Sequence, residues 1–137
     1  MKLVRGAAIV FAVLTAGVVV FQFALAFGAP WGGYAMGGAH PGVFPPALRV
    51  AAVVQGVILA ATAVVVLSRS GLILDRWARV STWLIWLVAA LGTVSLVLNV
   101  ITPDVAERAI WAPVAALLLV CSVTVGVGAR MLESRRA

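Results

Sequence analysis

Four long apolar runs constrain the fold of this 137-residue chain more than any other feature of its sequence. They cover residues 7–27, 47–67, 81–101 and 110–129, which is about 20 residues each. A helix rises about 1.5 Å per residue, so each run matches a hydrocarbon core of roughly 30 Å. Barrel strands need only about 10 residues with alternating polarity, and the runs show no alternation. Because backbone in lipid must hydrogen-bond within itself, the runs predict four membrane-spanning α-helices in one antiparallel bundle.

The composition supports a membrane protein with a single domain over residues 1–137. Hydrophobic residues make up 64% of the chain and charged residues only 10%, with a mean hydropathy of +1.18. Soluble proteins usually have about 25% charged residues. The net charge of +6 comes from short basic clusters between the apolar runs rather than from a basic patch, which argues against nucleic-acid binding. The lipid bilayer is therefore the expected partner.

The positions of the basic residues predict the orientation of the helices. Short cytoplasmic loops are enriched in Lys and Arg. Arg49 and Arg108 fall on one side of the predicted helices, and we expect that side to be outside. The other side, which should be cytoplasmic and includes both termini, carries Lys2, Arg5, Arg69, Arg76, Arg79, Arg130, Arg135 and Arg136. The composition and topology together predict a multi-pass protein of the cell membrane, with both termini in the cytoplasm.

The first run has some features of a signal peptide. Lys2 and Arg5 precede it, and Ala24-Leu25-Ala26 is similar to a cleavage site. The apolar part of a signal peptide is about 7 to 15 residues long, however, and this run is longer. We therefore expect it to be kept as an uncleaved helix.

The fourth helix has two possible starting points in the sequence. Thr102-Pro103-Asp104 has the pattern of a helix start, with a Thr cap followed by Pro and an acidic residue. Pro113 follows about ten residues later, and an interior Pro removes a backbone donor. We interpret 103–109 as a short interfacial turn, with the spanning helix beginning near Trp111. A single kinked helix is the alternative.

Neutral polar side chains share a depth in the outer half of the predicted bundle. They are Gln22, Gln55 and Asn99, with Ser95 one turn deeper. No ionisable residue falls in the middle of a run, which lowers the expectation of a proton-coupled transporter. Two interpretations follow: an outward-facing polar pocket, or hydrogen bonds between helices worth about 0.6 kcal/mol each. Such bonds are widespread in small bundles, which favours the second interpretation.

The first run also carries a stripe of small and polar residues at helical spacing. We expect this stripe to pack against other helices, because small residues let helices approach closely. The opposite face, with Phe11, Phe21 and Leu25, is expected to face lipid. The stripe consists of Ala8, Ala12, Thr15, Val19, Gln22 and Ala26.

The outer loop 28–46 is rich in Gly, Pro and aromatic residues. Because Trp and Tyr prefer the headgroup region, Trp31 and Tyr34 predict a loop at the outer interface. Asp104 and Glu107 follow the third helix on the same side, where we expect them to cap the fourth helix and to pair with Arg108 or Arg49.

The sequence favours neither a cofactor nor catalysis. His40 is the only histidine and Cys121 the only cysteine, so haem and zinc lack their usual ligand sets. Cys121 is expected to be a small buried side chain. The predicted topology blocks a Ser-His-Asp arrangement, because Ser68, Ser70 and Ser81 fall on the side opposite His40. We therefore predict no metal, no cofactor and no enzymatic activity.

Two outer segments together resemble a group of small bacterial membrane proteins. The first is Gly28-Ala29-Pro30-Trp31-Gly32, followed by Gly37-Gly38 and by Pro45-x-x-Leu48-Arg49; the second is Glu107-Arg108-Ala109-Ile110-Trp111-Ala112-Pro113. The resemblance runs from about Gln22 to Gly126. It implies an uncharacterised family of four-helix integral membrane proteins with outer-face A-P-W-G and E-R-x-x-W-x-P motifs, and no particular activity. Gly33-Tyr34 and Ala39-His40 depart from the more basic loop that the resemblance leads us to expect.

Two functional hypotheses follow from these observations. The first is a non-enzymatic accessory or scaffold protein that contacts a membrane-protein partner or a second copy of itself. The second is a binder or carrier of a small neutral or lipidic ligand in the outer polar pocket. Its candidate ligand-binding residues are Gln22, Trp31, Arg49, Gln55, Asn99, Glu107, Arg108 and Trp111.

Overall fold

The computed structural model describes residues 1–135, and over that range the chain is all-α with four long helices. The helices are α1 (Lys2–Ala26), α2 (Pro46–Arg69), α3 (Ala78–Ile101) and α4 (Val105–Ser134). Each is long and apolar enough to cross a membrane. Short 3₁₀ turns lie in the connections at Gly32–Tyr34, Met36–Gly38 and Asp75–Trp77. The prediction of long apolar helices is confirmed, whereas Arg136, one of the basic residues used to predict orientation, lies outside the described residues.

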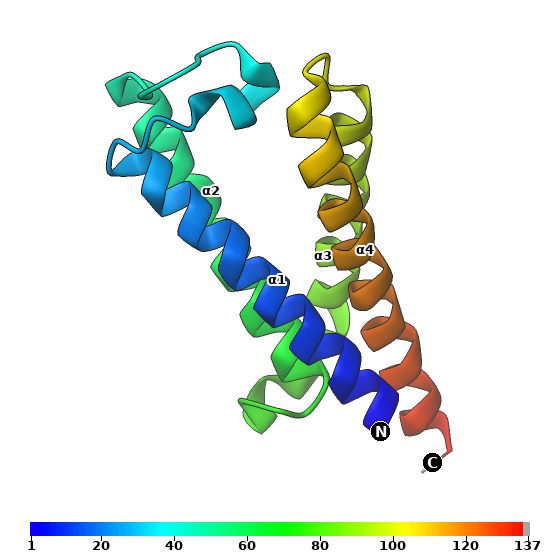
Figure 1. Cartoon of the computed structure of the whole chain (residues 1–137). Coiled ribbons are helices and arrows are strands. Elements are labelled where there is room, and N and C mark those ends of the chain that lie inside the picture. The colour runs from blue at the N-terminus through cyan, green and yellow to red at the C-terminus, as the bar shows by residue number, and fades with distance from the viewer. Residues whose placement is uncertain (136–137) are drawn as a thin grey trace.

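The two ends of the molecule differ. The N-terminus, the C-terminal end of α4 and the α2–α3 connection lie at one end, which we call the termini end (Figure 1). The loop 27–45 and the α3–α4 connection lie at the other, which we call the loop end. Helix α1 packs along α2, and α3 along α4. These pairs meet near the termini end and diverge toward the loop end (Figure 1).

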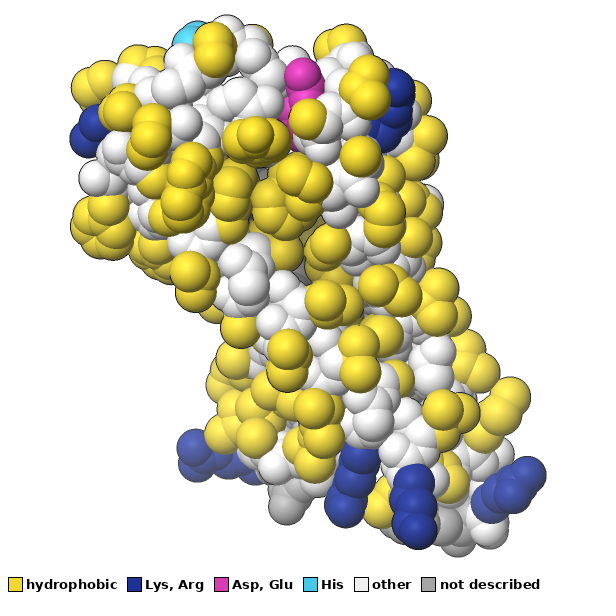
Figure 2. Space-filling view, viewed as in Figure 1, with side chains coloured by type: hydrophobic (Ala, Val, Ile, Leu, Met, Phe, Trp, Pro, Cys, Tyr) yellow, Lys and Arg dark blue, Asp and Glu magenta, His cyan; other side chains and the backbone are white. Residues whose placement is uncertain are grey.

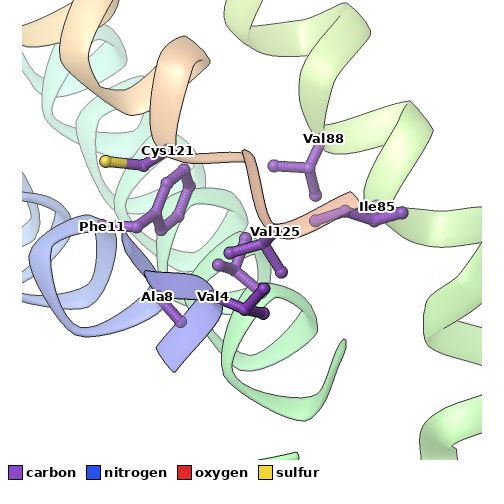
Figure 3. Close-up of a cluster of buried hydrophobic side chains, with 8 residues drawn as sticks. Val4, Ala8, Phe11, Ile85, Val88, Cys121 and Val125 are labelled. Carbon is purple, nitrogen blue, oxygen red and sulfur yellow. The ribbon is translucent and has the colours of Figure 1, made fainter. Parts of the chain in front are cut away.

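A cluster of buried side chains from all of these helices joins the pairs near the termini end (Figure 3). Helix α1 supplies Val4, Ala8 and Phe11 to it. Cys121 is also in the cluster, which confirms that it is buried, and it forms no disulfide. The other members are Val66 from α2, Ile85 and Val88 from α3, and Val125 from α4.

Glycines allow close contacts between the helices. A Cβ added at Gly56 would lie 3.3 Å from the Phe23 ring, where α2 meets α1. At Gly128 it would lie 2.6 Å from Cγ2 of Val4, where α4 meets α1. Both distances are shorter than ordinary van der Waals contact, so a larger side chain at either glycine would push these helices apart.

The buried face of α1 is wider than the small-residue stripe predicts. Ala8, Thr15 and Gln22 are buried as expected. Phe11 and Leu25, which we expected to face lipid, are only 4% and 0% exposed, so that prediction is wrong. The reason is that α1 contacts both α2 and α4, and two neighbours at different angles cover more of a helix than one narrow stripe.

Helix α4 begins at Val105 and runs without interruption through Pro113 to Ser134. Our interpretation of 103–109 as a separate interfacial turn is therefore wrong, and a single helix is correct. An Asp104 carboxylate oxygen accepts from the Glu107 backbone N–H at 2.7 Å. The prediction that Asp104 caps this helix is therefore confirmed, and the prediction of a Thr102 cap is wrong. Pro113 is tolerated because it costs one backbone hydrogen bond in a helix of 30 residues.

An ion pair joins α2 to α4 at the termini end. The Arg69 guanidinium donates to both carboxylate oxygens of Glu133, at 2.6 and 2.9 Å. The Arg69 side chain is 3% exposed, whereas that of Glu133 is 59% exposed. The sequence pattern had assigned Arg69 only an orienting role, so this contact between helices is an addition.

Candidate functional site

A chamber with several polar side chains in its wall lies at the loop end, between the diverging helix pairs. Its volume is about 110 Å³, and α1, α2, α3, α4 and the loop all contribute to its wall. Most of the wall is apolar. Its polar side chains are Gln22, Gln55, Ser95, Asn99 and Glu107.

A larger apolar groove between α2 and α3 adjoins the chamber. This groove has a volume of about 450 Å³, and residues of α4 form its floor. Thr62 and Ser122 are among the few polar side chains that line it. The two spaces are neighbours because they share the wall residues Gln55, Leu59, Ser95, Ala115 and Leu118.

Two of the chamber's polar side chains are buried without complete hydrogen bonding. Gln22 is 6% exposed and Glu107 is 7% exposed. Oε1 of Gln22 and Oε2 of Glu107 have no hydrogen-bond partner. The Gly37 and Gly38 peptide groups and the Thr102 side chain hydrogen-bond to the Glu107 carboxyl group, but they leave Oε2 unpaired. Since buried polar atoms are nearly always paired, two unpaired acceptors on one chamber are unusual.

The other amides are arranged differently. Asn99 donates from Nδ2 to the Ser95 carbonyl oxygen at 2.7 Å, one turn back in its own helix. Gln55 is exposed and lies where the chamber meets the groove. Within residues 1–135, none of Gln22, Gln55 and Asn99 makes a side-chain hydrogen bond to another helix. The expected interhelical hydrogen bonds are therefore not formed by these side chains.

Aromatic side chains close one side of the chamber. The Phe21 ring is stacked on the Trp31 ring, with ring centroids 6.1 Å apart. It also contacts the Trp111 ring, with centroids 4.7 Å apart. Nε1 of Trp111 donates to the Tyr34 carbonyl oxygen at 2.7 Å, which ties α4 to the loop. Because Phe21 and Trp111 also line the chamber, these contacts fix part of its wall.

The loop over the chamber is folded rather than extended. Phe44 is buried beneath it, and the Gly32 N–H donates to the Gly42 carbonyl oxygen at 2.9 Å. Gly37 and Gly38 have φ values of 77° and 70°, a conformation that glycine adopts without strain. The turn they form places Met36 in the chamber wall and the Gly38 backbone beside Asp104.

The structure brings some of the predicted site residues together and separates others. Gln22, Gln55, Asn99, Glu107 and Trp111 line the chamber. Trp31 contacts Phe21 at its outer side. Arg49 and Arg108 are not in the wall. Arg49 donates to the Phe44 carbonyl oxygen at 2.9 Å, and Arg108 donates to the Thr102 carbonyl oxygen at 3.1 Å. Their predicted pairing with Asp104 or Glu107 is wrong, because the Arg49 guanidinium binds the loop just before its own helix α2 and the Arg108 guanidinium binds the end of α3 instead.

Sequence reasoning missed the apolar part of this site. Leu59, Ala115 and Leu118 form the wall between chamber and groove, but in the sequence they are ordinary members of apolar helices. Met36 carried a weak signal, since it precedes the Gly37-Gly38 pair. No group of three or more His, Cys, Asp and Glu side chains that could hold a metal occurs within residues 1–135. His40 is exposed on the loop.

Comparison with known proteins does not add to this geometry. No family model, no curated protein and no solved structure matches the chain. The resemblance to small bacterial membrane proteins with A-P-W-G and E-R-x-x-W-x-P segments therefore stays a prediction.

Proposed function

We propose that the chain spans a bacterial inner membrane as a four-helix antiparallel bundle, with the termini end in the cytoplasm and the loop end outside. Lys and Arg side chains gather at the termini end, and hydrophobic side chains cover the middle of the molecule (Figure 2). An apolar belt between polar ends suits a bilayer, and the basic end corresponds to the cytoplasmic side.

In this membrane the protein acts as a non-enzymatic binder or carrier of a lipidic ligand. The polar head of the ligand enters the chamber, and its hydrocarbon chain lies in the groove between α2 and α3. The observation that carries this proposal is that the two spaces lie side by side and share Gln55, Leu59 and Ser95 in their walls. A chamber with polar side chains next to an apolar groove has the two parts that an amphiphile needs.

The unpaired acceptors also favour ligand binding over a purely structural role. Side chains kept only to hold helices together would be expected to bond across them, whereas Oε1 of Gln22 and Oε2 of Glu107 have no partner. The accessory or scaffold role, which was the first hypothesis from the sequence, is the alternative. It would assign the groove to a helix of a partner protein or of another copy of this chain.

Native mass spectrometry of the protein released from membranes in mild detergent tests the proposal. We expect a bound amphiphile of defined mass. Val54→Trp should reduce its occupancy, because Val54 lines the groove and an indole ring would fill it. Val57→Trp is the matched control: Val57 is on the same helix and similarly exposed, and it does not line either space.

Two results would count against ligand binding. One is a protein that carries no amphiphile. The other is equal amphiphile occupancy in Val54→Trp and Val57→Trp, which would indicate bound lipid that is not in the groove. Copurification of a stoichiometric membrane protein that is lost only in Val54→Trp would favour the accessory hypothesis instead.

A further inference from the structure

The chamber contains an acidic group that no basic side chain of its wall neutralises. Glu107 is 7% exposed, and no Lys, Arg or His is among the described residues that line the chamber. The nearest basic residue in sequence, Arg108, donates to the Thr102 carbonyl oxygen. Arg49 donates to the Phe44 carbonyl oxygen. The Gly37 and Gly38 peptide groups and the Thr102 side chain hydrogen-bond to the Glu107 carboxyl group, whereas Asp104 adds a second negative charge beside it. Oε2 of Glu107 is still unpaired, so a cation that reached this atom would find an acceptor and a negative charge that no basic side chain of the wall balances.

The two unpaired atoms specify the kind of group that would fit. A carboxylate oxygen and an amide oxygen are both hydrogen-bond acceptors. A partner for both must therefore present at least two donors. A positive charge on that partner would strengthen the bond to Glu107. Phe21 and Trp111 line the same chamber, and aromatic faces attract cations.

We infer that the ligand is a long-chain amine, whose protonated primary or secondary amino group binds between Glu107 and Gln22 and whose hydrocarbon chain lies in the α2–α3 groove. This inference rests on the proposed ligand-binding function and names its ligand class. A chamber of about 110 Å³ has room for an ammonium group and its first methylene groups, since a cavity of about 150 Å³ accommodates benzene.

The wall also argues against an aminophospholipid. A phosphodiester beside the amine would bring a negative charge close to Glu107. Phosphate groups are usually held by Arg, Lys or a row of backbone amides. The chamber wall presents no basic side chain among the described residues. An amine without a phosphate therefore fits the charges better than phosphatidylethanolamine does.

Four probes with the same twelve-carbon chain separate these contributions. They are dodecylammonium, dodecyltrimethylammonium, dodecanol and dodecylphosphoethanolamine. Their Kd values are measured by native mass spectrometry titration of the full-length protein in one detergent. The first has charge and N–H donors, the second has charge alone, and the third has one neutral donor. The fourth has the amine together with a phosphate. We expect dodecylammonium to bind at least about tenfold more tightly than each of the others, in keeping with a charge-assisted hydrogen bond.

Substitutions show which residues cause the preference for dodecylammonium. Glu107→Gln should bring dodecylammonium to within about twofold of dodecanol while dodecanol still binds, because the groove is unchanged. Gln22→Leu should lower the preference for dodecylammonium over dodecyltrimethylammonium. Leu3→Lys is the control for overall charge, because it also raises the net charge by one, at an exposed position of the termini end, and it should leave the preference unchanged.

The outcomes separate this inference from the proposed function. If the wild-type protein binds all four probes equally, and Val54→Trp weakens them all, the amine assignment is overturned and the amphiphile site remains. A preference for dodecylphosphoethanolamine would also overturn it, in favour of an aminophospholipid. If no probe binds, or if Val54→Trp and Val57→Trp behave alike, the proposed function itself fails. The comparison among probes uses the wild-type protein, so it holds even if Glu107→Gln does not fold.

Discussion

At the scale of single residues, Gly32 determines whether the loop can close over the chamber. A Cβ at this position would collide with the His40 carbonyl oxygen and would lie 2.8 Å from both the Gly42 carbonyl oxygen and the Phe44 ring. We expect Gly32→Ala to lower the free energy of unfolding by about 1–3 kcal/mol, the usual effect of overpacking. Reversible unfolding in mixed micelles, followed by tryptophan fluorescence, measures the change.

Gly33→Ala is the matched control for this prediction. Gly33 is adjacent in sequence, but the closest atom to an added Cβ is 3.8 Å away, at Pro41. Its effect should stay within about 0.5 kcal/mol, as for most surface substitutions. Equal effects of the two variants would mean that the loop does not pack as described.

At the scale of helices, the ion pair between Arg69 and Glu133 holds α2 against α4. Because the Arg69 side chain is buried, removing its partner leaves a charge without compensation. We expect Glu133→Gln to destabilise the protein more than the double variant Arg69→Met/Glu133→Met does. A double-mutant cycle of unfolding free energies measures this difference. A larger destabilisation by the double variant than by Glu133→Gln would show that the pair stabilises mainly by attraction. Arg79→Gln, at an exposed position of α3, controls for the loss of one charge from this end.

Sequence reasoning predicted which segments are helical better than it predicted their faces and ends. The length and hydropathy of α1 and α4 identify them as helices, because these properties are local. That Phe11 is buried depends on where α2 and α4 lie, and the sequence of α1 does not contain that information. Likewise, the start of α4 depended on whether Thr102 or Asp104 makes the capping bond. The local pattern allows both, and the contacts of the α3 end with Arg108 come only from the assembled fold.

The candidate site was predictable to a similar degree. Gln22, Gln55 and Asn99 are rare polar residues in apolar helices, so their shared depth is visible in the sequence. Arg49 and Arg108 were expected beside them and instead bind backbone carbonyl groups. A long flexible side chain can reach several acceptors, and its choice depends on tertiary structure. The groove was not predictable, because it results from the divergence of two helix pairs and from no particular residue.

At the scale of the whole molecule, the orientation proposed in the membrane makes a direct prediction. In a Cys121→Ser background, Ala39→Cys at the loop end should react in intact cells with a membrane-impermeant maleimide. Leu72→Cys, in the α2–α3 connection at the termini end, should react only after the membrane is permeabilised. Both positions are exposed, so accessibility of the thiol decides the result. The reverse pattern would place the termini outside.

The divergence of the helix pairs predicts where ligand binding changes the structure. The buried cluster around Phe11 and the Arg69–Glu133 ion pair join the pairs near the termini end, whereas the chamber and the groove separate them toward the loop end. A ligand can shift only those parts of the structure whose states it binds differently. We therefore expect dodecylammonium to act on the loop end alone.

Pulsed electron paramagnetic resonance between spin labels tests this in the Cys121→Ser background. One pair of labels, at Val50→Cys on α2 and Ile110→Cys on α4, reports on the loop end. A second pair, at Val64→Cys on α2 and Met131→Cys on α4, reports on the termini end. All four of these side chains are exposed. The ligand should narrow the distance distribution of the first pair, because it fills the space between the helices, and should leave the second pair unchanged. A change in both pairs would mean that the cluster and the ion pair do not act as a fixed base. A change in neither would mean that the chamber is preformed and rigid, so that the unpaired atoms of Gln22 and Glu107 are held in place before the ligand arrives.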